Sequence, residues 1–277
     1  MGDEERVLYQ VADRIATITL NRPEKRNAIT FAMRDAIVDY LDAAGADRNS
    51  RVVVVRGNGP AFTSGVDIGD RTDLQDPSAR TFEEDLAEIT SAARSWERLW
   101  ELPKPVLVKA HGHCIGWGLE IALHADMVLA SLDCRFAYPS VSMGSGLPDS
   151  TMAIYHLGPQ WAKRLLLAGD TIDGRTAARI GLVMEALPDD ELDGAIDALA
   201  RRMAALPPDL LAESKRVVNR GVDLMGRAVL LDVAAHANAA FRRSPSAAAF
   251  MRLVQERGGS AAIESRSGDA RPADPSR

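Results

Sequence analysis

Apolar residues recur along the first two thirds of the chain at spacings typical of both strands and helices. Two β-rich runs, at residues 7–10 and 15–20, are separated by a polar turn and predict an opening hairpin. Residues 52–55 are four consecutive valines, which is typical of a strand buried on both faces of a sheet. Residues 30–44 and 79–102 carry apolar side chains every three or four positions, which predicts helices. The fold class is therefore α/β, built from stacked β-β-α units.

A change in this pattern divides the chain. We interpret residues 1–190 as the β-β-α core, because strands and helices alternate there. Residues 191–257 have only helical periodicity and are expected to form a C-terminal helical subdomain. Residues 258–277 are rich in Gly, Ser, Arg, Asp and Pro and are predicted to be a disordered tail.

Composition excludes several classes of function. The formal charge of −6 and the pI near 5.5 argue against a nucleic-acid partner, which would need a basic face. No apolar run reaches the length of a membrane span, and residues 1–5 lack the apolar core of a signal peptide. Only Cys114 and Cys134 occur, both in apolar contexts that suggest burial, so a disulfide framework is not expected. We expect a soluble cytoplasmic protein.

Two glycine-rich segments each follow a predicted strand. Residues 61–68 read Ala-Phe-Thr-Ser-Gly-Val-Asp-Ile, and residues 111–120 read His-Gly-His-Cys-Ile-Gly-Trp-Gly-Leu-Glu. A glycine-rich turn from a strand into a helix leaves backbone N–H groups free at the positive end of the helix dipole. Such groups stabilise negative charge that develops on a carbonyl oxygen.

Together with residues 21–28, Asn-Arg-Pro-Glu-Lys-Arg-Asn-Ala, this set resembles the crotonase (enoyl-CoA hydratase/isomerase) superfamily over about residues 7–255. The resemblance implies a crotonase-like spiral of β-β-α units with a C-terminal α-helical trimerisation region. It also implies a trimer or a dimer of trimers, and an acyl-CoA substrate. No cofactor is implied beyond the coenzyme A carried by the substrate.

The resemblance carries over to particular residues. It implies that the backbone N–H groups of Val66 and Trp117 hold the thioester oxygen. Trp117 stands where the family usually has a small residue, and its indole is expected to reshape the acyl pocket. Glu120 matches one of the family's two catalytic glutamates. Its apolar helix would raise its pKa toward neutrality, which suits a general acid/base. The structural alternative is an ion pair or hydrogen bond with His124, one turn on.

Ser140 stands where hydratases of the family carry their second glutamate. A serine is not a comparable base, so double-bond isomerisation or related enolate chemistry is favoured over simple hydration. Asp149 is the nearest replacement carboxylate, although an aspartate after a proline also suits the N-cap of the following helix. Tyr138 is a weaker candidate, as a hydrogen-bond donor. Two alternatives remain open, a β-keto-acyl-CoA hydrolase or decarboxylase and a non-catalytic acyl-CoA carrier or sensor.

The predicted substrate-binding residues lie in the same motifs. Lys25 and Arg26 are either phosphate-binding cations or a solvated surface pair, and Asp67 is expected to brace its own loop. No metal site is predicted, because the His-x-His pair at residues 111–113 has no further ligand at suitable spacing. The full substrate-binding set is Lys25, Arg26, Ala28, Ser64, Gly65, Asp67, Ile68, Gly116 and Ser140.

Overall fold

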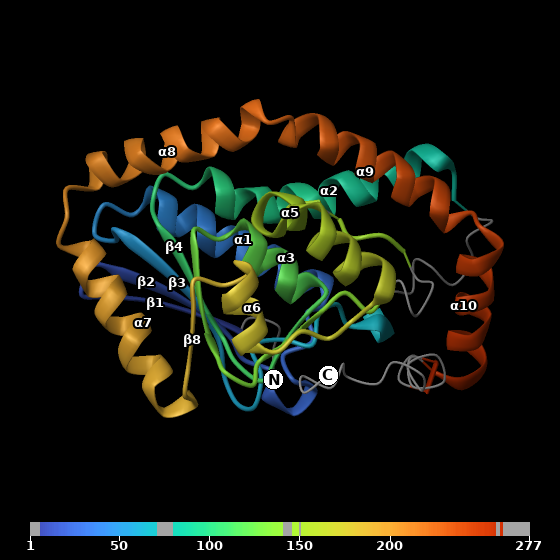
Figure 1. The fold of residues 1–277 in the computed structure, drawn as a ribbon, viewed down its shortest axis with the longest axis horizontal. Helices are drawn as coiled ribbons and strands as arrows, with labels where there is room; N and C mark the ends of the chain where they lie inside the picture. The colour runs from blue at the N-terminus through green and yellow to red at the C-terminus, as the bar shows by residue number, and fades with distance from the viewer. Residues whose placement is uncertain (1–5, 71–79, 141–145, 150, 259–260, 263–277) are drawn as a thin grey trace.

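A six-stranded sheet lies at the centre of the fold (Figure 1). The computed structural model describes residues 6–70, 80–140, 146–149, 151–258 and 261–262. The sheet order is β1-β2-β3-β4-β6-β8; only β1 and β2 are antiparallel, and the other neighbours are parallel. The strands are β1 (Val7–Ala12), β2 (Ile15–Leu20), β3 (Val52–Gly57), β4 (Val106–Ala110), β6 (Met127–Ser131) and β8 (Glu185–Leu187).

The predicted opening hairpin is confirmed. Strands β1 and β2 pair from Val7 opposite Leu20 to Ala12 opposite Ile15. Asp13 and Arg14 form the two-residue turn, and both have positive φ, 51° and 64°. A turn of this kind matches the right-handed twist of the strands it joins.

The helices agree with the predicted pattern in most places, and their ends differ from the predicted ends by a few residues. The helix that begins at Ala153 is interrupted at Gly158, whose φ is 69° and which precedes Pro159. The helices are α1 (Phe31–Ala46), α2 (Phe82–Glu101), α3 (Trp117–His124), α5 (Ala153–Lys163), a π-helical turn (Arg164–Ala168), α6 (Gly174–Ile180), α7 (Asp189–Ala204), α8 (Pro208–Leu224), α9 (Arg227–Arg242) and α10 (Pro245–Arg257).

A second sheet has two strands, and the first of them directly precedes α3 in the chain. Strand β5 (His113–Ile115) pairs in parallel with β7 (Arg135–Ala137). Strands of three residues are too short to show an alternating pattern, so the sequence did not predict them. Short 3₁₀ helices cover Pro23–Lys25 and Ile68–Asp70.

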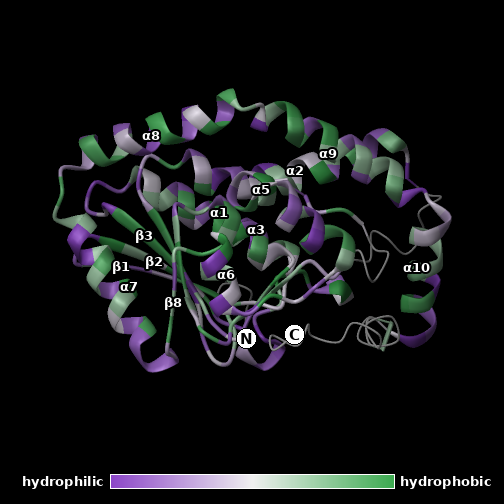
Figure 2. Cartoon of the chain, viewed as in Figure 1, coloured by the Kyte–Doolittle hydropathy of each residue, from purple (hydrophilic) through white to green (hydrophobic). Residues whose placement is uncertain are grey.

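The C-terminal helices form an outer layer. Helices α8 and α9 run one after the other along one edge of the molecule, and α10 continues down its side (Figure 1). Hydrophobic residues appear on α8 and α9 as well as in the interior (Figure 2). Of the tail predicted to be disordered, Ala262 packs against Phe250; residues 259–260 and 263–277 lie outside the described residues. None of the helices in the described ranges is both long and apolar enough to cross a membrane.

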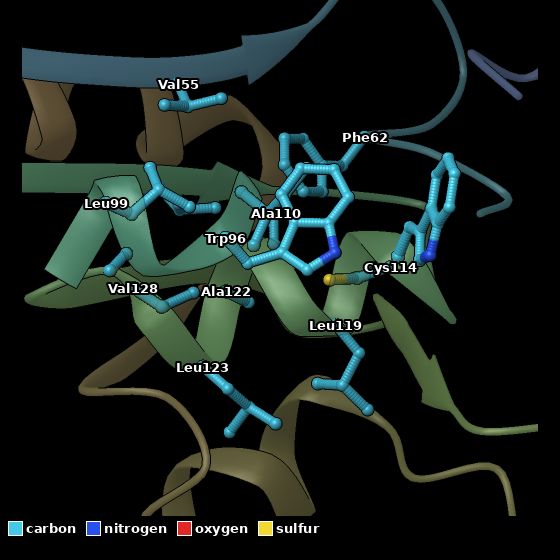
Figure 3. Packing of buried hydrophobic residues seen from close by; sticks show 14 of the residues in the cluster. Val55, Phe62, Trp96, Leu99, Ala110, Cys114, Leu119, Ala122, Leu123 and Val128 are labelled. Carbon is cyan, nitrogen blue, oxygen red and sulfur yellow. The ribbon is translucent and has the colours of Figure 1, made fainter. Parts of the chain in front are cut away.

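Both faces of β3 are buried, as its run of valines predicts. Val53 and Val55 face the core that α1, α2 and α3 cover, where Trp96 and Phe62 are also packed (Figure 3). Val52 and Val54 face α7 on the other side. Helix α7 therefore covers the other face of the sheet and belongs to the core. The sequence pattern predicts most of this helix as part of the C-terminal subdomain. Cys114 and Cys134 are buried free thiols.

A buried lysine attaches α8 to the core. The Lys215 ammonium lies 2.8 Å from Asp126 Oδ2 and donates to the carbonyl oxygens of Leu99, at 2.8 Å, and Lys104, at 3.2 Å. Burial lowers the pKa of Lys215 and raises the pKa of Asp126, while their attraction opposes both shifts. The pair therefore joins α8, the end of α2 and the start of β6 through one desolvated contact.

We expect Lys215→Met to lower the free energy of unfolding by about 3 kcal/mol, because it leaves the Asp126 carboxylate buried without its cation. Urea denaturation followed by circular dichroism measures the change. Lys163→Met is the matched control, since Lys163 is exposed at the end of α5. Equal stability of the two variants would contradict a structural role for the buried pair.

Candidate active site

The three sequence motifs lie side by side in the fold. The Ile29 N–H donates to the Gly65 carbonyl at 2.8 Å, which joins the first motif to the second. The Thr63 N–H donates to the His113 carbonyl at 2.9 Å, and the Ile115 N–H donates to the Thr63 carbonyl at 3.2 Å. Segments separated by dozens of residues are therefore fixed to one another by backbone hydrogen bonds.

Asn27 anchors the loop at residues 61–65. Its side chain is fully buried, and its amide donates to the carbonyl oxygens of Ala61, at 2.8 Å, and Asn58, at 2.9 Å. Thr63 Oγ1 donates to the Asn27 carbonyl at 2.6 Å and accepts from the Gly65 N–H at 3.0 Å. The sequence motif contained Asn27 and Thr63, but only the contacts reveal that they hold the loop.

Two glycines allow the two loops to pack against each other. Gly65 and Gly116 both have positive φ, 91° and 53°. A Cβ atom on Gly65 would lie 2.7 Å from the Ile115 carbonyl oxygen and 3.5 Å from the Gly116 Cα. A side chain at residue 65 would therefore force the loops apart as well as strain the backbone.

The backbone N–H groups that follow these glycines have no acceptor among the described residues. Within the part of the chain that the structure describes, neither the Val66 N–H nor the Trp117 N–H makes a hydrogen bond. The ladder of α3 begins with Glu120, whose N–H donates to the Gly116 carbonyl at 3.0 Å. Two free donors on adjoining loops, one of them at the first turn of a helix, form an arrangement suited to an oxyanion.

The Trp117 indole has a definite role in the packing. It is 7% exposed and meets Phe31 and Trp96 edge to face, with ring centroids 5.8 Å and 5.5 Å apart. Its Nε1–H donates to Asp149 Oδ2 at 2.6 Å. The tryptophan at residue 117, where the family usually has a small residue, therefore supplies a buried donor to the Asp149 carboxylate. The sequence did not predict this contact.

Asp149 does not occupy the N-cap position of the next helix. Helix α5 begins at Ala153, and its N-cap residue is Met152, which makes no side-chain cap hydrogen bond. The carboxylate of Asp149 instead accepts from the Trp117 indole. Asp149 is therefore not the N-cap residue that the structure assigns to α5.

Tyr138 lies near two carboxyl groups. Glu120 is 1% exposed and Tyr138 is 3% exposed. Burial raises the pKa of the Tyr138 hydroxyl well above its ordinary value, and the carboxylates of Glu120 and Asp149 raise that pKa further. The hydroxyl therefore stays protonated and is available as a donor. Ser140, two residues on, has a buried Oγ with no hydrogen-bond partner among the described residues.

Glu120 also has His124 as a neighbour, as its structural interpretation requires. His124 Nδ1 lies 2.8 Å from the Glu120 carbonyl oxygen and 3.8 Å from Glu120 Oε2. The two interpretations of Glu120 are therefore compatible, since a carboxylate next to a histidine can still face a substrate.

The remaining predicted residues surround this region. Asp67 braces its loop as expected, accepting from Arg22 Nη1 at 2.6 Å and from the Gly69 N–H at 3.0 Å. Lys25 and Arg26 have exposed side chains, and their carbonyl oxygens accept from the hydroxyl and N–H of Ser64. Ala28 and Ile68 are half-buried. No three or more His, Cys, Asp or Glu side chains gather as a metal site in the described residues.

Known proteins resemble this chain over most of its length. The family model described as enoyl-CoA hydratase/isomerase matches residues 10–246. The putative enoyl-CoA hydratase EchA13 of Mycobacterium tuberculosis (strain ATCC 25618 / H37Rv) is 34% identical, over 82% of this chain and 78% of its own length. The 2,3-dehydroadipyl-CoA hydratase of Escherichia coli (strain K12) is 31% identical, over 76% of this chain and 80% of its own length.

Solved structures agree as well. A crystal structure of an enoyl-CoA hydratase from Mycobacterium smegmatis superimposes with a TM-score of 0.89 at 31% identity, covering 98% of both chains. An enoyl-CoA hydratase/isomerase from Xanthobacter autotrophicus Py2 also gives a TM-score of 0.89, at 32% identity, covering 97% of this chain and 99% of its own.

Proposed function

The chain belongs to the enoyl-CoA hydratase/isomerase family of acyl-CoA enzymes, and from this premise we propose that it hydrates a 2-enoyl-CoA. The N–H groups of Val66 and Trp117 would hold the thioester oxygen. Glu120 and Asp149 would be the two carboxylates that handle water and the α-proton. The observation that carries this proposal is the hydrogen bond from the Trp117 indole to Asp149.

The two free N–H groups support stabilisation of an enolate. When a nucleophile adds to the β-carbon of an enoyl thioester, negative charge moves to the carbonyl oxygen. Preorganised donors in a water-poor site stabilise that charge by several kcal/mol. Gly65 and Gly116 keep the Val66 and Trp117 donors on adjoining loops before any substrate binds, so no reorganisation is needed at that step.

Asp149 supports hydration over the isomerisation that Ser140 alone favours. The sequence favours isomerisation because residue 140 is a serine and not a second glutamate. Asp149 is a second carboxylate near Tyr138, as Glu120 is, and the indole of Trp117 fixes its orientation. Hydration would then place the water oxygen on the β-carbon and a proton on the α-carbon. The Tyr138 hydroxyl, which stays protonated, would donate a hydrogen bond to the water oxygen.

The substrate class follows from the family and from the relatives. The relatives named above include hydratases of enoyl-CoA and of 2,3-dehydroadipyl-CoA. The exposed cations Lys25 and Arg26 adjoin the Ser64 loop and would pair with phosphates of coenzyme A. Coenzyme A would enter only as part of the substrate, with no further cofactor.

We expect Glu120→Gln and Asp149→Asn each to lower the hydration rate by about a hundredfold or more, because each removes a proton-transfer group. The measurement is mass spectrometry of a 2-enoyl-CoA panel incubated in heavy water. The wild-type product should be a 3-hydroxyacyl-CoA with deuterium at the α-carbon. Both variants should still bind the CoA ester. Glu185→Gln, at an exposed glutamate of β8, is the control that should stay active.

The same measurement separates the alternatives. A product with a shifted double bond and no added oxygen would show that the protein is an isomerase and not a hydratase. Cleavage of β-keto thioesters would indicate a hydrolase or decarboxylase. Tight binding with neither exchange nor product across the panel would overturn the enzymatic proposal in favour of an acyl-CoA carrier or sensor.

We also propose that the protein assembles with further copies of itself, as a trimer or a dimer of trimers, through α8 and α9. These helices expose several large apolar side chains to water in the single chain, and gathered apolar side chains on a surface often mark a contact with another protein. Their inner faces are already occupied by polar contacts such as Asn219 to the Trp100 carbonyl at 2.8 Å. The exposed apolar residues are Leu210, Val217, Val218, Leu224, Met225, Val229 and Val233.

Leu224→Glu should shift the protein toward a smaller species in analytical ultracentrifugation, because a carboxylate would be desolvated in the contact. Leu167→Glu is a closely matched control, since Leu167 is 73% exposed and Leu224 is 75% exposed. A Leu224→Glu sedimentation profile identical to that of wild type would exclude this part of α8 from the assembly contact.

A further inference from the structure

Trp117 contributes two groups to the proposed site, a backbone N–H and an indole. The residues on either side of it are glycines, and a Cβ atom on Gly118 would lie 2.4 Å from Cγ2 of Thr63. The indole is therefore the one side chain that residues 116–118 provide beside the loop at 61–65. It belongs to the same residue whose N–H would hold the thioester oxygen, so it lies within one side-chain length of that oxygen.

The far end of the indole is fixed as well. Its Nε1–H donates to Asp149 Oδ2 at 2.6 Å, and the side chain is 7% exposed. One end of this side chain is therefore at the oxyanion donor, and the other end is at a carboxylate that would act on the reacting carbons. The ring spans the site between these two groups.

Two further aromatic rings support the indole from α1 and α2. Phe31 and Trp96 meet it edge to face, with ring centroids 5.8 Å and 5.5 Å away. Trp96 is fully buried in the core (Figure 3), and the Arg34 guanidinium lies 5.1 Å from the centre of the Phe31 ring. Moving the indole toward either helix would require these packed rings to move too, which a close-packed interior resists. On the side of α1 and α2 the site therefore ends at the indole.

The acyl group would approach this wall from the outside of the fold. Lys25 and Arg26, which would pair with phosphates of coenzyme A, have exposed side chains and adjoin the Ser64 loop. The thioester carbonyl would follow, between the N–H groups of Val66 and Trp117. The carbons beyond the carbonyl would then extend inward, away from the exposed cations and toward the buried aromatic rings. The indole is the first of these rings that they would meet.

We propose that Trp117 closes the inner end of the acyl site and selects acyl-CoA substrates with few carbons beyond the reacting double bond. The inference rests on the proposed function, because it takes the thioester oxygen to lie between the two free N–H groups. Trp117 is then a specificity-determining residue, and through its Nε1–H it is also the positioning residue of Asp149.

Two substitutions separate the size of the indole from its hydrogen bond. Trp117→Phe keeps an aromatic ring and removes the Nε1–H donor, whereas Trp117→Ala removes both; each keeps the backbone N–H. Trp117→Phe should slow the hydration of every enoyl-CoA by a similar factor and keep the wild-type preference for short acyl groups. Trp117→Ala should raise kcat/KM for 2-decenoyl-CoA relative to crotonyl-CoA by about tenfold or more, because the longer chain gains apolar space.

The test measures kcat/KM of wild type and both variants with crotonyl-CoA, 2-hexenoyl-CoA and 2-decenoyl-CoA. Trp161→Ala is the matched control, because it removes another tryptophan ring, which packs 5.0 Å from the Arg164 guanidinium after α5. This control should keep the wild-type preference. Wild-type protein that hydrates 2-decenoyl-CoA as efficiently as crotonyl-CoA would overturn the inference. An active Trp117→Ala variant with the wild-type preference would overturn it as well.

A second measurement depends neither on turnover nor on the folding of a variant. Isothermal titration calorimetry of wild-type protein compares saturated butanoyl-CoA, hexanoyl-CoA and decanoyl-CoA. In an open apolar pocket each further buried methylene tightens binding. The inference predicts that decanoyl-CoA binds no more tightly than butanoyl-CoA, and affinity that rises steadily with chain length would overturn it. If the protein binds short acyl-CoAs but converts no enoyl-CoA, the proposed function fails while the limit on acyl length still holds.

Discussion

The contact between two glycine loops is the constraint on which the rest of the site depends. Gly65 and Gly116 approach so closely that a single Cβ atom on Gly65 would collide with the backbone of Ile115. This approach brings together the turns that carry the Val66 and Trp117 N–H groups. The parallel strands β3 and β4 fix where these turns begin, since the chain reaches the first turn from β3 and the second from β4 through β5. The sheet therefore positions the two N–H donors, because short segments of chain connect them to its strands.

The acidic groups are held by a different set of forces. Glu120 is placed by α3, whereas Asp149 lies in an irregular segment and depends on side-chain contacts. Asn238 of α9 bonds to both backbone groups of Leu147, two residues before Asp149, at 3.2 Å each. Arg227, at the start of the same helix, reaches Glu120 through Glu97 and His124. Helix α9 therefore contacts the segments that carry both carboxylates, and its Val229 and Val233 side chains are exposed.

Much of this arrangement could be predicted from the sequence, because local rules determine it. The four valines of β3, the hairpin before β3 and the glycine turns each follow from periodicity or backbone conformation. The contact between the Trp117 indole and Asp149 could not, because the two residues are 32 positions apart and no periodic pattern connects them. His124 was visible one turn after Glu120, but its partner Glu97 comes from another helix. Long-range polar pairs of this kind have no signal in a single sequence.

The central claim is that two backbone N–H groups polarise the carbonyl of a bound thioester. Raman difference spectroscopy of a saturated acyl-CoA, labelled with carbon-13 at the thioester carbonyl, measures this polarisation directly and involves no turnover. The account predicts that the carbonyl stretch moves to lower frequency on binding than in water, because two preorganised donors replace mobile solvent. A frequency equal to that in water, or higher as in an apolar solvent, would contradict an oxyanion site formed by Val66 and Trp117.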